Sequence, residues 1–277
     1  DHDLGDGKPV GCKGKIDFLF VISRYSGMAY FQTQLRDAFP KFIDTIEAKF
    51  ADFDYHIMVV DGDATWGVST CDEQCPTQCV PNYPCGYTPT YCDTRIGAGT
   101  VFPAGGDAAN QPCDIDGGRR YMTTGQSKLK ETFACVAQVG SSGNAQIGDA
   151  LTAAVHSNTN DPGGCNPGFL RRDALLMVTL ISNTYESPGM PWGSQGTPET
   201  WAAAVRKAKG DSLESVVLLN IGDTMVPGCH EKDRLCQMVK LFPFALNAEV
   251  WAQDYGPFFE EATDLVETAC AGFVPPQ

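Results

Sequence analysis

The amino-acid sequence predicts an α/β fold with a doubly wound, mostly parallel central sheet that is flanked by helices. Four short runs consist almost entirely of apolar residues, at 15–22, 55–60, 173–181 and 215–221. Strands of this composition are buried on both faces, as they are in parallel sheets. Helical patterns separate the runs, and this alternation is typical of a sheet that helices cover on both faces.

The helices are predicted from the spacing of apolar side chains. In 29–49 these side chains recur three or four positions apart, which predicts a helix, and Pro40 is expected to kink this helix or split it. A short strand is expected at 248–252. Further helices are expected near 126–138, 146–157, 197–209, 231–242 and 256–270.

Two segments differ from this pattern. Residues 1–14 are polar and Gly-rich, which indicates a tail or linker ahead of a single domain over 15–277. Residues 62–125 contain six cysteines, many Gly and Pro residues and little periodicity. We interpret 62–125 as a long insertion that disulfides hold together in place of a hydrophobic core.

The chain has 12 cysteines, an even number, and they are dispersed along it. They lack the two close Cys/His pairs of a zinc site, so a disulfide framework is favoured over metal binding. The six in the insertion are expected to pair largely among themselves. Disulfides need an oxidising compartment, which predicts a secreted or cell-surface protein. The cysteines are Cys12, Cys71, Cys75, Cys79, Cys85, Cys92, Cys113, Cys135, Cys165, Cys229, Cys236 and Cys270.

The formal net charge of −14 comes from 34 acidic and 20 basic residues. Such a surface repels phosphate backbones and anionic membranes, so nucleic-acid binding is not expected. No apolar stretch approaches the length of a transmembrane helix, and membrane insertion is not expected either. The chain opens with neither a basic start nor an apolar run, so we expect a mature form or a fragment of a longer precursor. No Asn-x-Ser/Thr sequon is present.

Several runs resemble those of von Willebrand factor A domains. The run DFLFVISRYSGM at 17–28 is similar to the family's first strand and loop, which usually reads DFLFVIDNSGSM in bacterial members. The similarity continues through 133–143, 163–181 and 255–270. It points to secreted, cysteine-rich bacterial members of the myxobacterial type. The resemblance implies the same α/β fold that the apolar pattern predicts.

The resemblance also implies a place for metal chemistry. In the family, three loops at the carboxyl ends of the strands supply hard oxygen ligands to Mg²⁺, two carboxylates among them. The first Asp of that motif falls on Ser23, its two serines on Tyr25 and Gly27, its Thr on Ser141 and its second Asp on Asn183. Both carboxylates are absent. The resemblance therefore implies a degenerate metal-ion-dependent adhesion site that does not bind Mg²⁺.

The same loops remain a candidate surface for a partner. Arg24 stands where the crest of the first loop is expected, and it could replace the metal by pairing bidentately with a partner's carboxylate. The alternative is that an inactive site has drifted and Arg24 is an ordinary solvated side chain. The candidate partner-binding residues are Arg24, Tyr25, Ser26, Thr184 and Tyr185.

Other signals for metal binding or catalysis are weaker. Acidic turns at Asp61 and Asp63, and at Asp114 and Asp116, could bind Ca²⁺, although most such turns are only turns. No Gly-x-Ser-x-Gly elbow, HExxH motif or phosphate-binding loop is present. The sequence predicts no catalytic residues and no cofactor, and we expect the protein not to be an enzyme.

The sequence thus predicts an extracellular module that acts by protein–protein contact or self-assembly and without a metal. An adhesin component, a surface-layer protein or a filament subunit would fit this description. Two alternatives remain open. One is a divalent-cation-dependent adhesion domain that uses the acidic turns, and the other is an accessory domain of a secreted hydrolase, because fold does not fix function.

Overall fold

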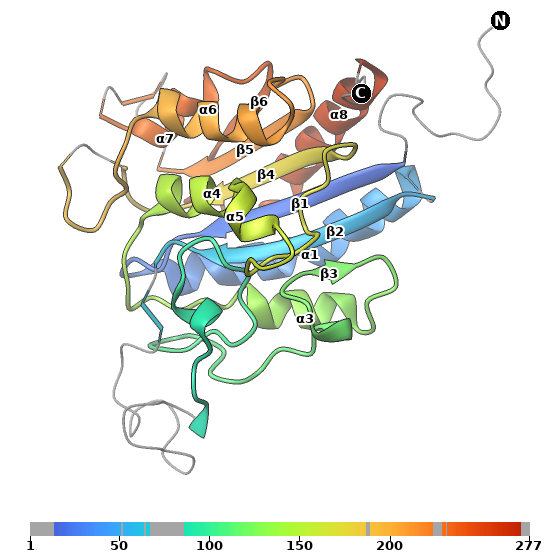
Figure 1. The fold of residues 1–277 in the computed structure, drawn as a ribbon. Coiled ribbons are helices and arrows are strands. Elements are labelled where there is room, and N and C mark those ends of the chain that lie inside the picture. The colour runs from blue at the N-terminus through green and yellow to red at the C-terminus, as the bar shows by residue number, and fades with distance from the viewer. Residues whose placement is uncertain are drawn as a thin grey trace, which may run out of the picture.

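The computed structural model confirms the predicted fold class (Figure 1). It describes residues 14–50, 52–63, 65–66, 86–186, 189–223, 229–230 and 232–272. Within these residues lies a six-stranded sheet in the order β3-β2-β1-β4-β5-β6. All neighbouring strands are parallel except β2 and β3. The strands are β1 Lys15–Ile22, β2 Asp54–Asp61, β3 Met122–Thr123, β4 Leu175–Ile181, β5 Val216–Gly222 and β6 Phe244–Glu249.

The helices cover both faces of the sheet. Pro40 lies inside α1, which is one helix, so the expectation of a split helix was wrong. Phe39, Phe42 and Ile43 are fully or almost fully buried beside Pro40, and this packing holds the helix together although proline removes a backbone donor. The helices are α1 Met28–Lys49, η3 Tyr91–Thr94, η4 Asp116–Gly118, α3 Leu129–Val136, α4 Ile147–Val155, α5 Ser157–Asn160, α6 Pro198–Ala208, α7 Arg234–Val239 and α8 Gly256–Gly272.

The edges of the sheet are where the sequence predicted least well. The last strand was expected at 248–252, but β6 runs over Phe244–Glu249. Most of its residues are only partly buried because it is an edge strand, so it lacks the apolar run of the central strands. The two-residue strand β3, which pairs with His56 and Ile57, was not predicted.

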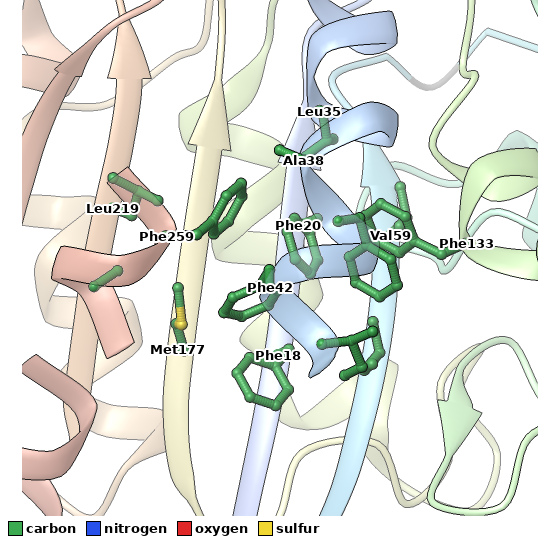
Figure 2. Close-up of a cluster of buried hydrophobic side chains, with 14 of the residues drawn as sticks. Phe18, Phe20, Leu35, Ala38, Phe42, Val59, Phe133, Met177, Leu219 and Phe259 are labelled. Atoms are coloured by element: carbon green, nitrogen blue, oxygen red, sulfur yellow. The ribbon is translucent and has the colours of Figure 1, made fainter. Parts of the chain in front are cut away.

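Alternate residues of β1 serve two hydrophobic cores. Phe18 and Phe20 face α1, α3 and α8, whereas Leu19 and Val21 face α4, α6 and α7. Figure 2 shows the first core, where Phe20 contacts Phe133 edge-on at a centroid distance of 4.9 Å. Both faces of the central strand are therefore dry, which explains its unbroken apolar sequence.

The disulfides fasten the insertion to the body of the domain. Cys92 pairs with Cys165 and Cys113 pairs with Cys135, so the expectation that these cysteines pair within the insertion was wrong. The insertion packs along β2, where Thr100 N–H donates to the Val59 carbonyl at 2.8 Å, and this brings its cysteines close to residues outside it. Cys229–Cys236 is a third bridge, and Cys270 is also disulfide-bonded.

Some predicted features lie outside the described residues. These are Cys12, Cys71, Cys75, Cys79 and Cys85, together with the N-terminal tail apart from Gly14. Among the cysteines that the structure describes, none is free.

Candidate functional site

Three loops meet at the carboxyl end of the parallel sheet: 23–27 after β1, 140–146 between α3 and α4, and the loop after β4. Arg24 N–H donates to the Asn144 carbonyl at 3.1 Å, and Gly143 N–H donates to the Arg24 carbonyl at 2.9 Å. The Asn183 side-chain amide donates to the Ser26 carbonyl at 2.9 Å. This is the end at which open α/β sheets commonly bind ligands.

Gln32, on α1, ties two of these loops together. Its buried side-chain amide donates to the Gly140 carbonyl at 2.7 Å and to the Ser23 carbonyl at 3.2 Å. Its oxygen accepts from Gly140 N–H at 3.1 Å. Because these polar groups are bonded and buried, they hold the loops in one arrangement.

The side chains at the positions that the sequence resemblance assigns to metal ligands are held by the protein itself. Ser23 Oγ is buried and accepts from Tyr25 N–H at 3.1 Å. Ser141 Oγ donates to the Asp107 carboxylate. Asn183 Oδ1 is buried without a hydrogen-bond partner, and Gly27 takes a φ of +83° at the start of α1. The structure thus brings Ser23, Gly27 and Asn183 close together, with Ser141 in the adjoining loop.

This donor set does not fit Mg²⁺. The cation needs several oxygen ligands and prefers carboxylates, and one orphaned amide oxygen does not replace two lost carboxylates. In the part of the chain that the structure describes, no three His, Cys, Asp or Glu side chains are placed to bind a metal ion together.

The Arg24 side chain does not lie where the sequence predicted. It was expected to face a partner or solvent, but it is only 1% exposed. One terminal nitrogen donates to the Ala104 carbonyl at 2.7 Å, and the other donates to the Thr65 carbonyl and lies 3.5 Å from Asp61 Oδ2. The guanidinium therefore points into the protein and links the β1–α1 loop to the insertion.

The acidic turn at Asp61 and Asp63 is occupied by protein donors. Asp61 accepts from Asp63 N–H at 3.1 Å, and Asp63 accepts from Thr65 N–H at 3.0 Å and from Asn144 N–H at 2.9 Å. Burial raises the pKa of Asp61 to about 6, against the opposing effect of Arg24. With Arg24 as the local cation, this turn does not fit Ca²⁺.

The second acidic turn is also used within the protein. The Asp116 carboxylate accepts from Ser127 N–H at 2.7 Å and from Ser127 Oγ at 3.0 Å. These bonds hold the pKa of Asp116 below its usual value. They join the turn of Asp114 and Asp116 to the chain that leads into α3, which is a structural role.

A buried ion pair between Glu186 and Arg234 was not predicted from the sequence. Glu186 accepts from Ile147 N–H at 2.6 Å and from Ser194 Oγ at 2.7 Å. Arg234 Nη2 lies 3.5 Å from Glu186 Oε2 and donates to the Ser194 carbonyl at 2.7 Å. Burial raises the pKa of Glu186 despite these partners. The partners are distant in sequence, so only the folded chain reveals this pair, which fixes the loop after β4.

Aromatic side chains gather around the junction of the loops, and we call six of them the aromatic rim. Tyr25 lies 5.7 Å from Trp192 between ring centroids, and Tyr185 stacks on His230 at 5.3 Å. The two most exposed members come from the start of α1 and from the turn after β6. The rim comprises Tyr25, Tyr30, Tyr185, Trp192, His230 and Trp251.

The candidate partner-binding residues other than Arg24 lie at or beside this rim. Ser26 is exposed, and Tyr25, Thr184 and Tyr185 are half-buried. Partial burial and nearby carboxylates, those of Asp223, Asp233 and Glu249, raise the pKa of Tyr185. Tyr185 therefore lies near three acidic side chains.

Comparisons with known proteins give structural neighbours only. No family model matches the sequence, and no curated protein matches it. Proximal thread matrix protein 1 from the mussel byssus is similar with a TM-score of 0.43 and 15% identity, over 91% of this chain and 48% of that one. The pilus adhesin SpaC from Lactobacillus rhamnosus GG is similar with a TM-score of 0.43 and 9% identity, over 91% of this chain and 30% of the adhesin. The chain thus spans about half of the mussel protein and less than a third of the adhesin.

Proposed function

We propose that this protein is a non-enzymatic extracellular module that binds another protein, or further copies of itself, through the aromatic rim and without a metal. The observation that carries the proposal is the exposure of large apolar side chains at this end of the sheet. Tyr30 is 50% exposed, Trp251 is 53% exposed, and Met190 in the loop after β4 is 38% exposed. Exposed aromatic residues are costly to leave in water and are enriched in binding hot spots.

The rim is also pre-organised. Phe31 is buried between the two exposed aromatics, 5.3 Å from Tyr30 and 4.9 Å from Trp251 between ring centroids, so both rings rest on the core. A partner that covers rings already held in place loses less side-chain entropy on binding. The rim can therefore serve as a contact surface without rearranging.

The chemistry of the histidines supports a role other than catalysis. His56 Nδ1 lies 2.8 Å from the Phe169 carbonyl, and His156 and His230 accept from backbone N–H groups near them in sequence. Of the hydrogen bonds that these three described histidines make, none joins a hydroxyl or a thiol. A nucleophile activated by histidine would need such a bond.

The oxidised cysteines support an extracellular location, because disulfides persist in oxidising compartments. Among the described helices, none has the length and apolar character needed to cross a membrane. We propose that the chain is a von Willebrand factor A-like domain with a degenerate metal site. A subunit of an adhesive or filamentous extracellular assembly fits these properties best.

The test is sedimentation velocity of the purified protein across the micromolar range, with negative-stain imaging of material from its source. The double variant Tyr30→Ser with Trp251→Ser should weaken association by at least tenfold, about 1.4 kcal/mol. Tyr91→Ser is the matched control, since Tyr91 is 68% exposed but lies in η3 of the insertion. A protein that is monomeric, captures no partner, and behaves identically in both variants would rule out the proposal.

A further inference from the structure

A cavity of about 360 Å³ lies on the face of the sheet that α4, α5 and α6 cover, and these helices lie on one side of the sheet in Figure 1. It opens at the amino end of the parallel strands, beside the carboxyl ends of α4 and α6. The aromatic rim is at the other end of the sheet. The lining residues that matter here are Thr152, Val155, Asp161, Leu170, Arg172 and Lys207.

Part of the lining is apolar and suits a hydrocarbon body. Val155 is almost fully buried, Leu170 is half-buried, and Ala204 and Ala208 line the cavity from α6. Small-molecule pockets measure about 300 to 1,000 Å³ and are mostly apolar with a few polar groups. The cavity is at the small end of that range, which limits the ligand to a compact molecule.

Two cations at the cavity lack carboxylate partners. Arg172 and Lys207 come from segments distant in sequence, and neither forms an ion pair with any residue that the structure describes. Other lysines of this acidic chain do pair, as Lys15 does with Asp173 at 2.6 Å and Lys130 with Asp44 at 2.6 Å. Both side chains are exposed, so they place two positive charges at the cavity where a ligand can reach them.

The helix ends do not account for these cations. Cations are favoured near the last carbonyls of a helix, but other donors already satisfy carbonyls at both ends here. Asn160 Nδ2 donates to the Ala154 carbonyl of α4 at 2.7 Å. Lys209 N–H and Asp211 N–H donate to the Arg206 carbonyl of α6, at 3.1 Å and 2.9 Å. Arg172 and Lys207 are therefore available to a ligand.

Thr152 also lines the cavity, but its Oγ1 is shielded from solvent, so this hydroxyl is not among the groups that a ligand can reach. Asp161 also lines the cavity, so two cations and one carboxylate leave one net positive charge.

We propose that this cavity binds a small monocarboxylate with an apolar body, such as a medium-chain alkanoate. The carboxylate pairs with Arg172 and Lys207, and the apolar body lies against the aliphatic lining. Asp161 disfavours a second negative charge, so dianions without an apolar body are excluded. The site is separate from the aromatic rim, and the proposal does not depend on the function proposed for that rim.

The test is calorimetric titration of the full chain with octanoate, with 1-octanol and inorganic phosphate as the two partial ligands. Octanoate should bind, and each partial ligand should bind at least tenfold more weakly. Arg172→Gln with Lys207→Gln should weaken octanoate binding at least tenfold, and Ala204→Phe should abolish it by filling the cavity. Arg206→Gln is the matched control, because Arg206 precedes Lys207 on α6 but does not line the cavity.

Each variant is checked by its thermal unfolding so that a misfolded protein is not read as a loss of binding. Failure of octanoate to bind the wild-type chain would overturn the proposal. So would equal binding of octanol, or octanoate binding that is unchanged in both the double variant and Ala204→Phe. Loss of the same affinity in the Arg206→Gln control would show a general charge effect and would also contradict the site.

Discussion

Replacing Arg24 by Met should destabilise the protein strongly, and more so at high pH. The change removes a buried guanidinium that donates to the carbonyls of Thr65 and Ala104 and lies 3.5 Å from Asp61. Removing one partner of a buried ion pair costs about 3 to 5 kcal/mol. We expect the lower end, about 3 kcal/mol, because the Asp61 side chain is 22% exposed and Arg24 Nε has no partner to lose.

The dependence on pH follows from Asp61, whose pKa is already raised to about 6 mainly by burial. A carboxyl with a raised pKa in the folded state favours folding when protonated, and this contribution is lost as the pH rises through the folded pKa. Without Arg24 the pKa of Asp61 should rise further, at about 1.4 kcal/mol per pKa unit. The cost of Arg24→Met should therefore be larger at about pH 8 than at about pH 5.

Urea unfolding followed by intrinsic fluorescence at both pH values measures this cost. Arg95→Met is the matched control: the Arg95 guanidinium lies 4.1 Å from the centroid of the Tyr91 ring on the surface, and its loss should cost little at either pH. In an Asp61→Asn background, Arg24→Met should cost less than in the wild type. A cost below about 1 kcal/mol at both pH values would show that the Arg24 side chain is solvated and refute the reasoning.

Three further outcomes are expected. Neither Mg²⁺ nor a chelator should change the unfolding temperature, because we expect no metal to bind these loops and only a ligand that binds the folded state raises that temperature. A rise of several degrees with Mg²⁺ would contradict the degenerate site. Asp233→Asn keeps the cap of α7 but removes a carboxyl whose pKa burial raises to about 6. It should stabilise the protein in urea unfolding by up to about 3 kcal/mol above pH 6 and by less than about 1 kcal/mol near pH 4, and an equal gain at both pH values would refute this. Replacing both cysteines of the Cys92–Cys165 bridge by Ala should lower the free energy of unfolding by about 4 kcal/mol, and the same change at Cys229–Cys236 should lower it by about 2.5 kcal/mol. The difference follows from the loop lengths of 73 and 7 residues, and a reversed order would contradict the loop-closure account.

The fold was predictable because its central strands are buried on both faces. In β1, β4 and β5 the apolar run is nearly unbroken and only seven or eight residues long, which favours a buried strand over a helix. β6 was misplaced by several residues because a partly exposed edge strand carries a weaker signal. The expectation that Pro40 splits the helix was wrong because the sequence does not show how much packing supports the helix around it.

The candidate site was less predictable because the direction of a side chain depends on distant residues. Sequence order places Arg24 in the loop after β1, but whether it faces solvent is decided by Asp61, Thr65 and Ala104. The pair of Glu186 and Arg234 likewise depends on residues 48 apart. The exposed rings of the aromatic rim could not be told from core residues by their type alone.

The bridge between Cys92 and Cys165 affects what happens to this chain when a protease cleaves it. The two cysteines are 73 residues apart, and they enclose most of the described insertion together with β3, α3, α4 and α5. A protease that cut one surface loop between them would leave both fragments joined by the bridge, and the sheet on either side would stay one covalent molecule. A cut between residues 92 and 165 would therefore not release a fragment while the Cys92–Cys165 bridge is intact.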